Sequence, residues 1–118
     1  MTHSMNLNES PFQMIMMGKK TIELRLNDEK RRLIHIGDYI LFTNTSNKTE
    51  TLLVEVINLY HFDSFKKLYE SLPLDKCGYE PDELSSASPD DMLLYYTEKE
   101  QQLYGVLGIE LKCLKSVY

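Results

Sequence analysis

The chain has 118 residues and a mass of 13.8 kDa, enough for one sizeable core, so we expect a single domain over residues 1–118. Hydrophobic residues make up 42% and charged residues 26%, which excludes general disorder and low-complexity fibrous chains. The net charge of −5 argues against a protein that binds nucleic acid over its whole surface, because phosphate contacts need many Lys and Arg side chains.

Charge is unevenly distributed along the chain. Residues 19–35 carry six Lys or Arg against three acids, a net charge of +3, whereas residues 63–100 carry four Lys against ten acids, a net charge of −6. The positive segment is either a local anion-binding face or a set of solvated loops. No apolar run reaches the roughly 20 residues that cross a bilayer, and the N-terminus lacks the features of a signal peptide. We therefore expect a cytoplasmic protein without membrane contact.

Residues that commonly bind metals are few and scattered. Cys77 and Cys113 are far apart, and the three histidines, His3, His35 and His61, form no paired-ligand motif. We expect free thiols, no metal and no cofactor.

The first predicted elements are a short helix and a strand. Ser10 and Pro11 are typical of a helix start and Gly18 of a helix end, so the pattern predicts a helix from about Pro11 to Met17. Residues 21–26 then alternate with period 2, which predicts a half-buried strand. One face of this strand holds Ile22, Leu24 and Leu26, and the other holds Thr21, Glu23 and Arg25.

The remaining chain predicts more strands with helices between them. Residues 39–42 and 51–59 are expected to pair as antiparallel strands across a polar loop, and Asp63 is expected to cap a helix that stops at Pro73. After an irregular stretch, Ser88 is expected to cap a helix through about Gln101. A last strand covers residues 104–114, where two glycines indicate a bend or a close backbone approach.

This order of elements predicts an α+β fold with an antiparallel barrel or curved sheet rather than a doubly wound fold. We expect one core, to which the following apolar residues contribute: Ile22, Leu24, Leu26, Ile40, Phe42, Val54, Val56, Val106 and Ile109.

Four segments together carry a family resemblance. They are the octet Gly18-Lys19-Lys20-Thr21-Ile22-Glu23-Leu24-Arg25, a Gly-Asp turn at residues 36–40, the segment 63–68, and the final strand that begins Tyr104-Gly105-Val106. The octet resembles the G-x-K-x-x-E-x-R signature of the ASCH domain family, within the PUA-like superfamily. The other three segments follow in the order found in small stand-alone bacterial and archaeal members. The resemblance covers the chain from about Leu7 to Leu114.

The resemblance implies a mainly antiparallel PUA-like β-barrel with short flanking helices and a cleft that holds Lys20, Glu23 and Arg25. The residue pattern agrees, because Glu23 and Arg25 share one strand face and Lys20 comes just before it. The alternative is an exposed ion pair, worth less than about 1 kcal/mol. For a functional cleft at a barrel mouth we expect substitutions here to cost little stability, unless Arg25 and Glu23 form a buried pair.

Two classes of function follow from the resemblance. In the first, the cleft binds RNA or a nucleotide or nucleoside, with these ligand-binding residues: Lys20, Glu23, Arg25, Tyr104, Arg31 and Arg32. In the second, the protein is a hydrolase of a modified nucleoside, similar to N4-acetylcytidine amidohydrolases, or a ribonuclease, with Lys20 and Glu23 as a catalytic acid/base pair. The amidohydrolase branch has a threonine three residues after the motif lysine, where this chain has Glu23. The sequence leaves open the ligand, the biological process, the oligomeric state and whether the protein is an enzyme.

Tyr95 and Tyr96 precede the final strand. Tyrosines near a basic cleft stack on bases, but the pattern favours packing for these two rings.

Overall fold

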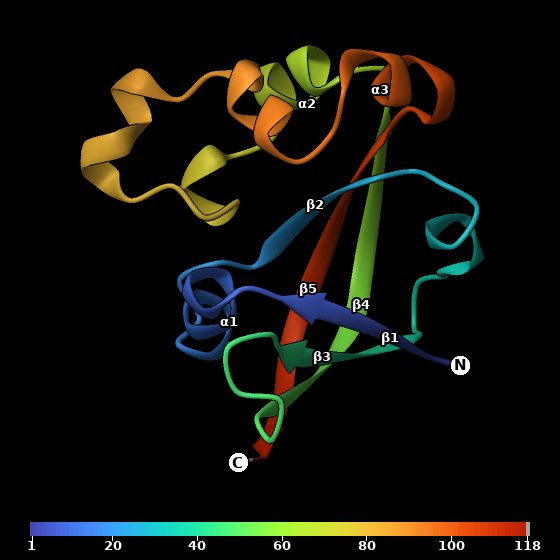
Figure 1. The fold of residues 1–118 in the computed structure, drawn as a ribbon, viewed down its shortest axis with the longest axis vertical. Helices are drawn as coiled ribbons and strands as arrows, with labels where there is room; N and C mark the ends of the chain where they lie inside the picture. The colour runs from blue at the N-terminus through green and yellow to red at the C-terminus, as the bar shows by residue number, and fades with distance from the viewer. Residues whose placement is uncertain (118) are drawn as a thin grey trace.

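A computed structural model describes the backbone of residues 1–117 and the side chains of residues 1–114. One five-stranded sheet forms its centre, with the strand order β1-β3-β4-β5-β2, and curls into a half-barrel whose edge strands are β1 and β2 (Figure 1). Among the strands of the described residues, β1 with β3 is the only parallel pair. The predicted α+β class with a mainly antiparallel sheet is confirmed. The strands are β1 (Thr2–Leu7), β2 (Ile22–Leu26), β3 (Tyr39–Asn44), β4 (Thr51–Phe62) and β5 (Val106–Val117).

Short helices connect the strands. The α-helices are α1 (Glu9–Met16), α2 (Phe65–Ser71) and α3 (Glu98–Tyr104), and the 3₁₀ helices are η1 (Arg31–Leu33), η2 (Leu74–Lys76), η3 (Pro81–Ser86) and η4 (Pro89–Leu94). The single helix expected from Ser88 to about Gln101 is wrong. Ser88 caps η4 as expected, but Thr97 starts a second capping box and therefore the separate helix α3. Two caps nine residues apart begin two short helices.

Two other helix starts differ from the prediction. Helix α1 begins at Glu9 after Asn8, so Ser10 lies inside it, and α2 is capped by the Ser64 side chain, which accepts a hydrogen bond from the Lys67 amide. Both true starts lie within two residues of the predicted ones. Ser64 caps α2 as well as the predicted Asp63 would, whereas the Asn8 side chain makes no capping hydrogen bond at the start of α1.

Strand β1 was not predicted. Its residues alternate between exposed and buried, and the buried ones are His3, Met5 and Leu7. A histidine and a methionine among three inward positions make a weak apolar pattern, so the alternation does not stand out in the sequence. Pairing with β3 stabilises the strand, and helix α1 connects it to the motif octet.

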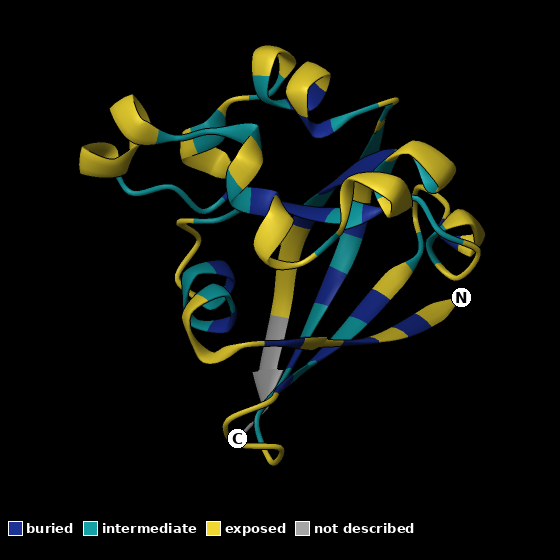
Figure 2. Cartoon of the chain, turned by 45° about the horizontal axis from the view of Figure 1, so that its top comes forward, coloured by how far each residue is buried: buried dark blue, intermediate teal, exposed yellow. Residues whose placement is uncertain are grey.

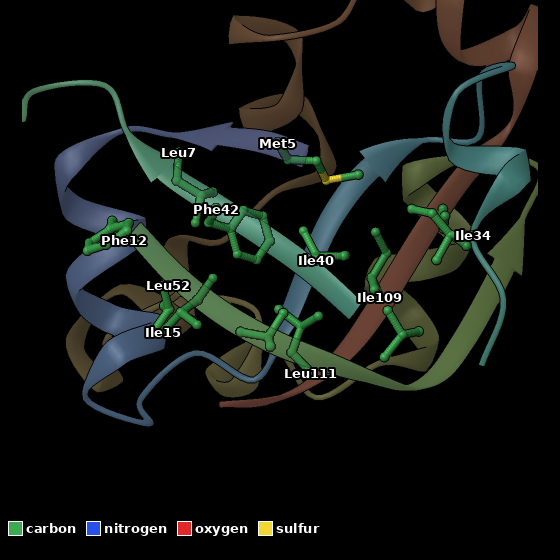
Figure 3. Packing of buried hydrophobic residues seen from close by; sticks show 13 residues of the cluster. Met5, Leu7, Phe12, Ile15, Ile34, Ile40, Phe42, Leu52, Ile109 and Leu111 are labelled. Atoms are coloured by element: carbon green, nitrogen blue, oxygen red, sulfur yellow. The ribbon is translucent and has the colours of Figure 1, made fainter. Parts of the chain in front are cut away.

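The buried apolar residues form two clusters rather than the single core expected. The first cluster packs Phe12 and Ile15 of α1 against the sheet (Figure 3). The second cluster packs Phe65 and Leu68 of α2 against β2. Figure 2 shows that buried residues follow the strands while exposed residues gather on the helices and turns.

All nine predicted core residues are buried, but they divide between the clusters. Ile22, Leu24, Leu26 and Val106 belong to the second cluster, and the other five belong to the first. The reason lies in β5, where Val106 and Leu107 face opposite sides of the sheet and both sides are covered. Within the described residues, no helix is long and apolar enough to cross a membrane.

Candidate functional site

Strand β2 positions the motif residues between the two clusters. Its apolar side chains enter the second cluster as the alternation predicts, and Glu23 and Arg25 therefore point to the other side. In the register with β5, Glu23 is paired with Ile109 and Arg25 with Leu107, two residues of the first cluster. This face is not open to solvent, because Glu23 is only 5% exposed.

Lys20, Glu23 and Arg25 form a compact ion triad, the name used below for these three residues. Lys20 Nζ lies 2.7 Å from Glu23 Oε1, and Arg25 Nη2 lies 2.8 Å from Glu23 Oε2. Arg25 Nε also donates to Oε2, at 2.9 Å. The side chains of Lys20 and Arg25 are 11% and 14% exposed, so the alternative of an exposed ion pair is wrong. The three motif residues converge as predicted, and they do so in a largely buried place.

Arg25 also joins the two edges of the sheet. Its Nη2 atom donates a hydrogen bond of 2.8 Å to the backbone carbonyl of Asn6 on β1, while Arg25 itself lies on β2. Edge strands leave backbone groups without a partner strand. Here a side chain satisfies one such carbonyl across the seam of the half-barrel.

The triad is held in its ionised form. Burial alone would raise the pKa of Glu23, but the charges of Lys20 and Arg25 and their hydrogen bonds outweigh it and lower the pKa to about 2. For Arg25, burial lowers the pKa, and the Glu23 carboxylate outweighs that effect and raises it. Glu23 is therefore an anion that anchors two cations and a weak proton acceptor near neutral pH.

This pKa predicts how acid affects stability. A carboxyl group with a pKa of about 2 in the folded state and 4.5 as its ordinary value stabilises the fold fully above pH 4.5, and loses that contribution as the pH falls through 2. We expect the difference in free energy of unfolding between the parent and Glu23→Gln, measured by urea titration, to shrink from pH 4.5 to pH 2. The contribution of Asp38, whose pKa is lowered mainly by a hydrogen bond from His3, is common to both proteins and cancels. A difference that stays constant over this range would contradict the assigned pKa.

A pocket of about 470 Å³ opens beside the ion triad. All three triad residues line it, together with Asn6 of β1 and Met14 of α1. The loop after η2 contributes Gly78, where an added Cβ would come within 3.2 Å of Lys20 Cδ. The absence of a side chain at Gly78 thus leaves room for the aliphatic stem of Lys20.

Aromatic and apolar side chains form another part of the lining. Tyr96 stacks on Phe65 at a ring distance of 6.2 Å and belongs to the margin of the second cluster, which confirms packing for this ring. Tyr95 differs, because it is 64% exposed while it lines the pocket. Leu94 beside it is 84% exposed. The pocket therefore has an open aromatic rim.

A chain of hydrogen bonds lines the pocket as well. Tyr79 donates its hydroxyl proton to Asp91 Oδ2 at 2.6 Å, and the hydroxyls of Tyr69 and Tyr79 lie 2.7 Å apart. The pKa of Tyr79 is raised, mainly by burial and secondly by the hydrogen bond to Asp91. This phenol therefore stays protonated. Sequence reasoning missed these three residues. Tyr69 lies in the helix predicted after Asp63, where the period indicates packing rather than a site. Tyr79 lies in the irregular stretch, and the only local signal for Asp91 was its place in the capping box of Ser88.

The other three predicted ligand-binding residues lie together but do not line the pocket. Arg31 pairs with Asp28 at 3.2 Å, and Arg32 lies over the Tyr104 ring, 6.0 Å from its centre. A ligand-binding role for Arg31, Arg32 and Tyr104 stays a prediction.

Cys77 is buried and Cys113 exposed, and both are free thiols as expected. Among the described residues, no group of three or more His, Cys, Asp or Glu side chains is arranged to hold a metal ion.

Comparison with known proteins settles the family. A sequence model of the ASCH domain matches residues 5–115. The chain belongs to the ASCH domain family. The family resemblance read from the motif octet is thereby confirmed, and the half-barrel is its PUA-like fold. Comparison with curated proteins gives no match.

Solved structures agree with this membership. The crystal structure of the hypothetical protein PH0355 is 34% identical with a TM-score of 0.79, and the match covers 97% of this chain and 100% of that one. The solution structure of PF0455 from Pyrococcus furiosus is 33% identical with a TM-score of 0.71, and covers 98% and 99%. An ASCH protein from Zymomonas mobilis is 13% identical with a TM-score of 0.68 over 98% of this chain and 72% of its own, a likeness of fold.

Proposed function

We propose that this ASCH domain binds a nucleoside in the pocket beside the ion triad, either free or as an unpaired residue of an RNA chain. The observation that carries the proposal is the pocket itself, which joins charged hydrogen-bond donors to an open tyrosine rim within about 470 Å³. That volume lies within the roughly 300 to 1,000 Å³ of small-molecule sites.

The triad supplies donors for a polar ligand. Glu23 takes one of the three N–H groups of Lys20, and among the described residues no hydrogen bond engages Arg25 Nη1. These donors suit a ring carbonyl, a ring nitrogen or a ribose hydroxyl. The exposed face of Tyr95 suits stacking, which is worth about 1 to 3 kcal/mol per base.

Charge favours an uncharged ring over a phosphate inside the pocket. The charged side chains that line the pocket are two cations, Lys20 and Arg25, and three anions, Glu23, Glu83 and Asp91. An RNA chain would therefore place one base in the pocket and its phosphates outside, toward the net-positive residues 19–35. This agrees with the acidic composition of the whole chain.

Hydrolysis of a modified nucleoside and RNA cleavage remain predictions from the family resemblance. A general base works best with a pKa near the working pH. Glu23 has a pKa of about 2 and both of its oxygens are engaged, which favours a role in holding Lys20 and Arg25 over a role in moving protons.

Thermal shift and calorimetric titration test the proposal with adenosine, cytidine, guanosine and uridine, their 5′-monophosphates, and short single-stranded RNA. We expect nucleosides to raise the Tm more than the monophosphates do at equal concentration. We expect Tyr95→Ala to weaken binding about tenfold at little cost in stability, because the ring is largely exposed. Tyr39→Ala is the matched control, since Tyr39 is 39% exposed on β3 and does not line the pocket.

The arms of this experiment separate the sources of the ligand. Binding of RNA without binding of free nucleosides would identify the polymer as the source, and such binding should weaken with salt because each phosphate contact releases counterions. Equal affinity in Tyr95→Ala and Tyr39→Ala, or no response to nucleosides or RNA, would refute the proposed function.

A further inference from the structure

Asp91 has one oxygen engaged and one free. Tyr79 Oη donates to Oδ2 at 2.6 Å, and the backbone amide of Ser88 donates to the same Oδ2 at 3.2 Å. Within the part of the chain that the structure describes, no hydrogen bond reaches Oδ1. Asp91 is half-buried and lines the pocket, so its second oxygen is a candidate acceptor for a ligand.

The direction of the hydrogen bonds to Asp91 is fixed. An ionised carboxylate only accepts, so Tyr79 must donate its single hydroxyl proton to Asp91. The Tyr79 oxygen then accepts the hydroxyl proton of Tyr69, 2.7 Å away. Both tyrosines are held in this way, and the Asp91 carboxylate is oriented by two donors on its Oδ2 side.

The pocket therefore offers donors from one set of residues and an acceptor from another. Lys20 and Arg25 carry the donors, and Asp91 carries the oriented acceptor. Glu83 also lines the pocket, but it is exposed, and its Oε1 atom accepts from the Glu80 amide. An exposed carboxylate is solvated and discriminates little between ligands, whereas a partly buried acceptor left without a donor costs free energy.

We propose that Asp91 determines specificity in this pocket, by accepting a hydrogen bond from an exocyclic amino group of the ligand's ring. The inference rests on the proposed function and goes further, because it names the class of nucleoside: amino-bearing bases such as cytosine and adenine are bound in preference to their oxo counterparts. A ring carbonyl facing Asp91 Oδ1 would place two hydrogen-bond acceptors against each other. The loss of a hydrogen bond that a site is built to make discriminates strongly between otherwise similar ligands.

Asp91→Asn tests this assignment because it changes one atom's chemistry. The donors from Tyr79 and Ser88 both meet Oδ2, so the single oxygen of the amide should stay there. The new Nδ2 group then takes the place of Oδ1 and turns an acceptor into a donor. The substitution should therefore invert the preference of the pocket without removing the contacts that hold residue 91.

The experiment measures Kd by calorimetry for two matched pairs, cytidine with uridine and adenosine with inosine, in which an amino group is replaced by a carbonyl. We expect the parent to bind the amino member about tenfold more tightly in each pair, which corresponds to about 1.4 kcal/mol. In Asp91→Asn we expect the oxo member to bind more tightly. Asp90→Asn is the matched control, because Asp90 precedes Asp91 in the same helix but is exposed and does not line the pocket, and it should keep the parental preference.

A second variant keeps the inference testable if Asp91→Asn does not fold. Tyr79→Phe retains the carboxylate but removes the donor that orients it, so the preference for the amino member should weaken without inverting. If nucleosides bind but the parent does not distinguish the members of both pairs, or if Asp91→Asn keeps the parental order, the inference is overturned and the proposed function stands. If the parent binds RNA but no free nucleoside, the same pairs of bases are compared within short single-stranded RNA, with the same expected order. Absence of binding to both nucleosides and RNA in the parent would overturn both.

Discussion

Glu23→Gln is expected to lower the free energy of unfolding by about 3 kcal/mol, because it leaves two largely buried cations without their shared anion. For a domain of this size the loss corresponds to a fall in Tm of roughly 10 °C. Urea and thermal unfolding near neutral pH measure both quantities. This expectation replaces the small cost inferred from the sequence, which assumed that the triad lay at an exposed barrel mouth.

The surface pair of Asp63 and Lys67 is the matched control for this substitution. Its atoms lie 3.2 Å apart, but the two side chains are 91% and 61% exposed, so Asp63→Asn should change stability by less than about 0.5 kcal/mol. A combined Lys20→Met, Glu23→Gln, Arg25→Met variant should recover part of the loss, because no buried charge is then stranded. If Glu23→Gln costs no more than Asp63→Asn, the triad contributes nothing as a buried charge network.

Gly105→Ala is expected to have a comparable effect, a loss of about 3 kcal/mol in the free energy of unfolding. Gly105 ends helix α3 with φ 72° and ψ −176°, a region that is costly for residues with a Cβ. A Cβ at this position would also lie 3.2 Å from the carbonyl oxygen of Phe62, a backbone atom held in the β4–β5 ladder. Strain and close contact therefore add. The close backbone approach expected at a glycine of residues 104–114 is confirmed at Gly105, although the strand begins at Val106 and Tyr104 belongs to α3.

Gly18→Ala separates strain from contact in this prediction. Gly18 has a similar φ of 78°, but a Cβ there would meet no atom within 4 Å. Only the backbone strain remains, so we expect a loss of about 1 kcal/mol. Equal losses for Gly105→Ala and Gly18→Ala in the same urea titration would mean that the Phe62 carbonyl moves aside and that the contact adds nothing.

The convergence of Lys20, Glu23 and Arg25 was predictable because it is local. Alternation places two of them on one strand face, and the third directly precedes the strand. Their burial was not predictable, since it depends on what covers that face. The covering comes from α1 and from residues 77–96, and the edge strand β1 lies across the seam. From sequence alone, a charged strand face is predicted to be exposed, because the segments that cover it are not known.

The hydrogen-bonded chain of tyrosines and Asp91 could not be predicted, because its residues lie in separate segments of the sequence. Three short segments supply these side chains: Tyr69 comes from α2, Tyr79 from the loop after η2, and Asp91 from η4. No common hydrophobic period in the sequence links these three segments. Their contacts depend on turns and caps, and each of these is defined by only a few residues. The strands β3, β4 and β5, by contrast, follow from continuous apolar and alternating runs, and these predictions are confirmed.

The Arg25 side chain connects the two ends of the half-barrel. The strands β1 and β2 are the two ends of the sheet, and within the described part of the chain no strand pairing connects them directly. The guanidinium reaches from one end to the Asn6 carbonyl of the other, and the same guanidinium lines the pocket. A ligand that takes the Arg25 Nη2 donor away from the Asn6 carbonyl loses the free energy of that hydrogen bond. A ligand that leaves the hydrogen bond intact binds beside a seam that stays closed. A ligand that binds through Arg25 Nη2 would thus couple occupancy of the pocket to closure of the sheet through one residue.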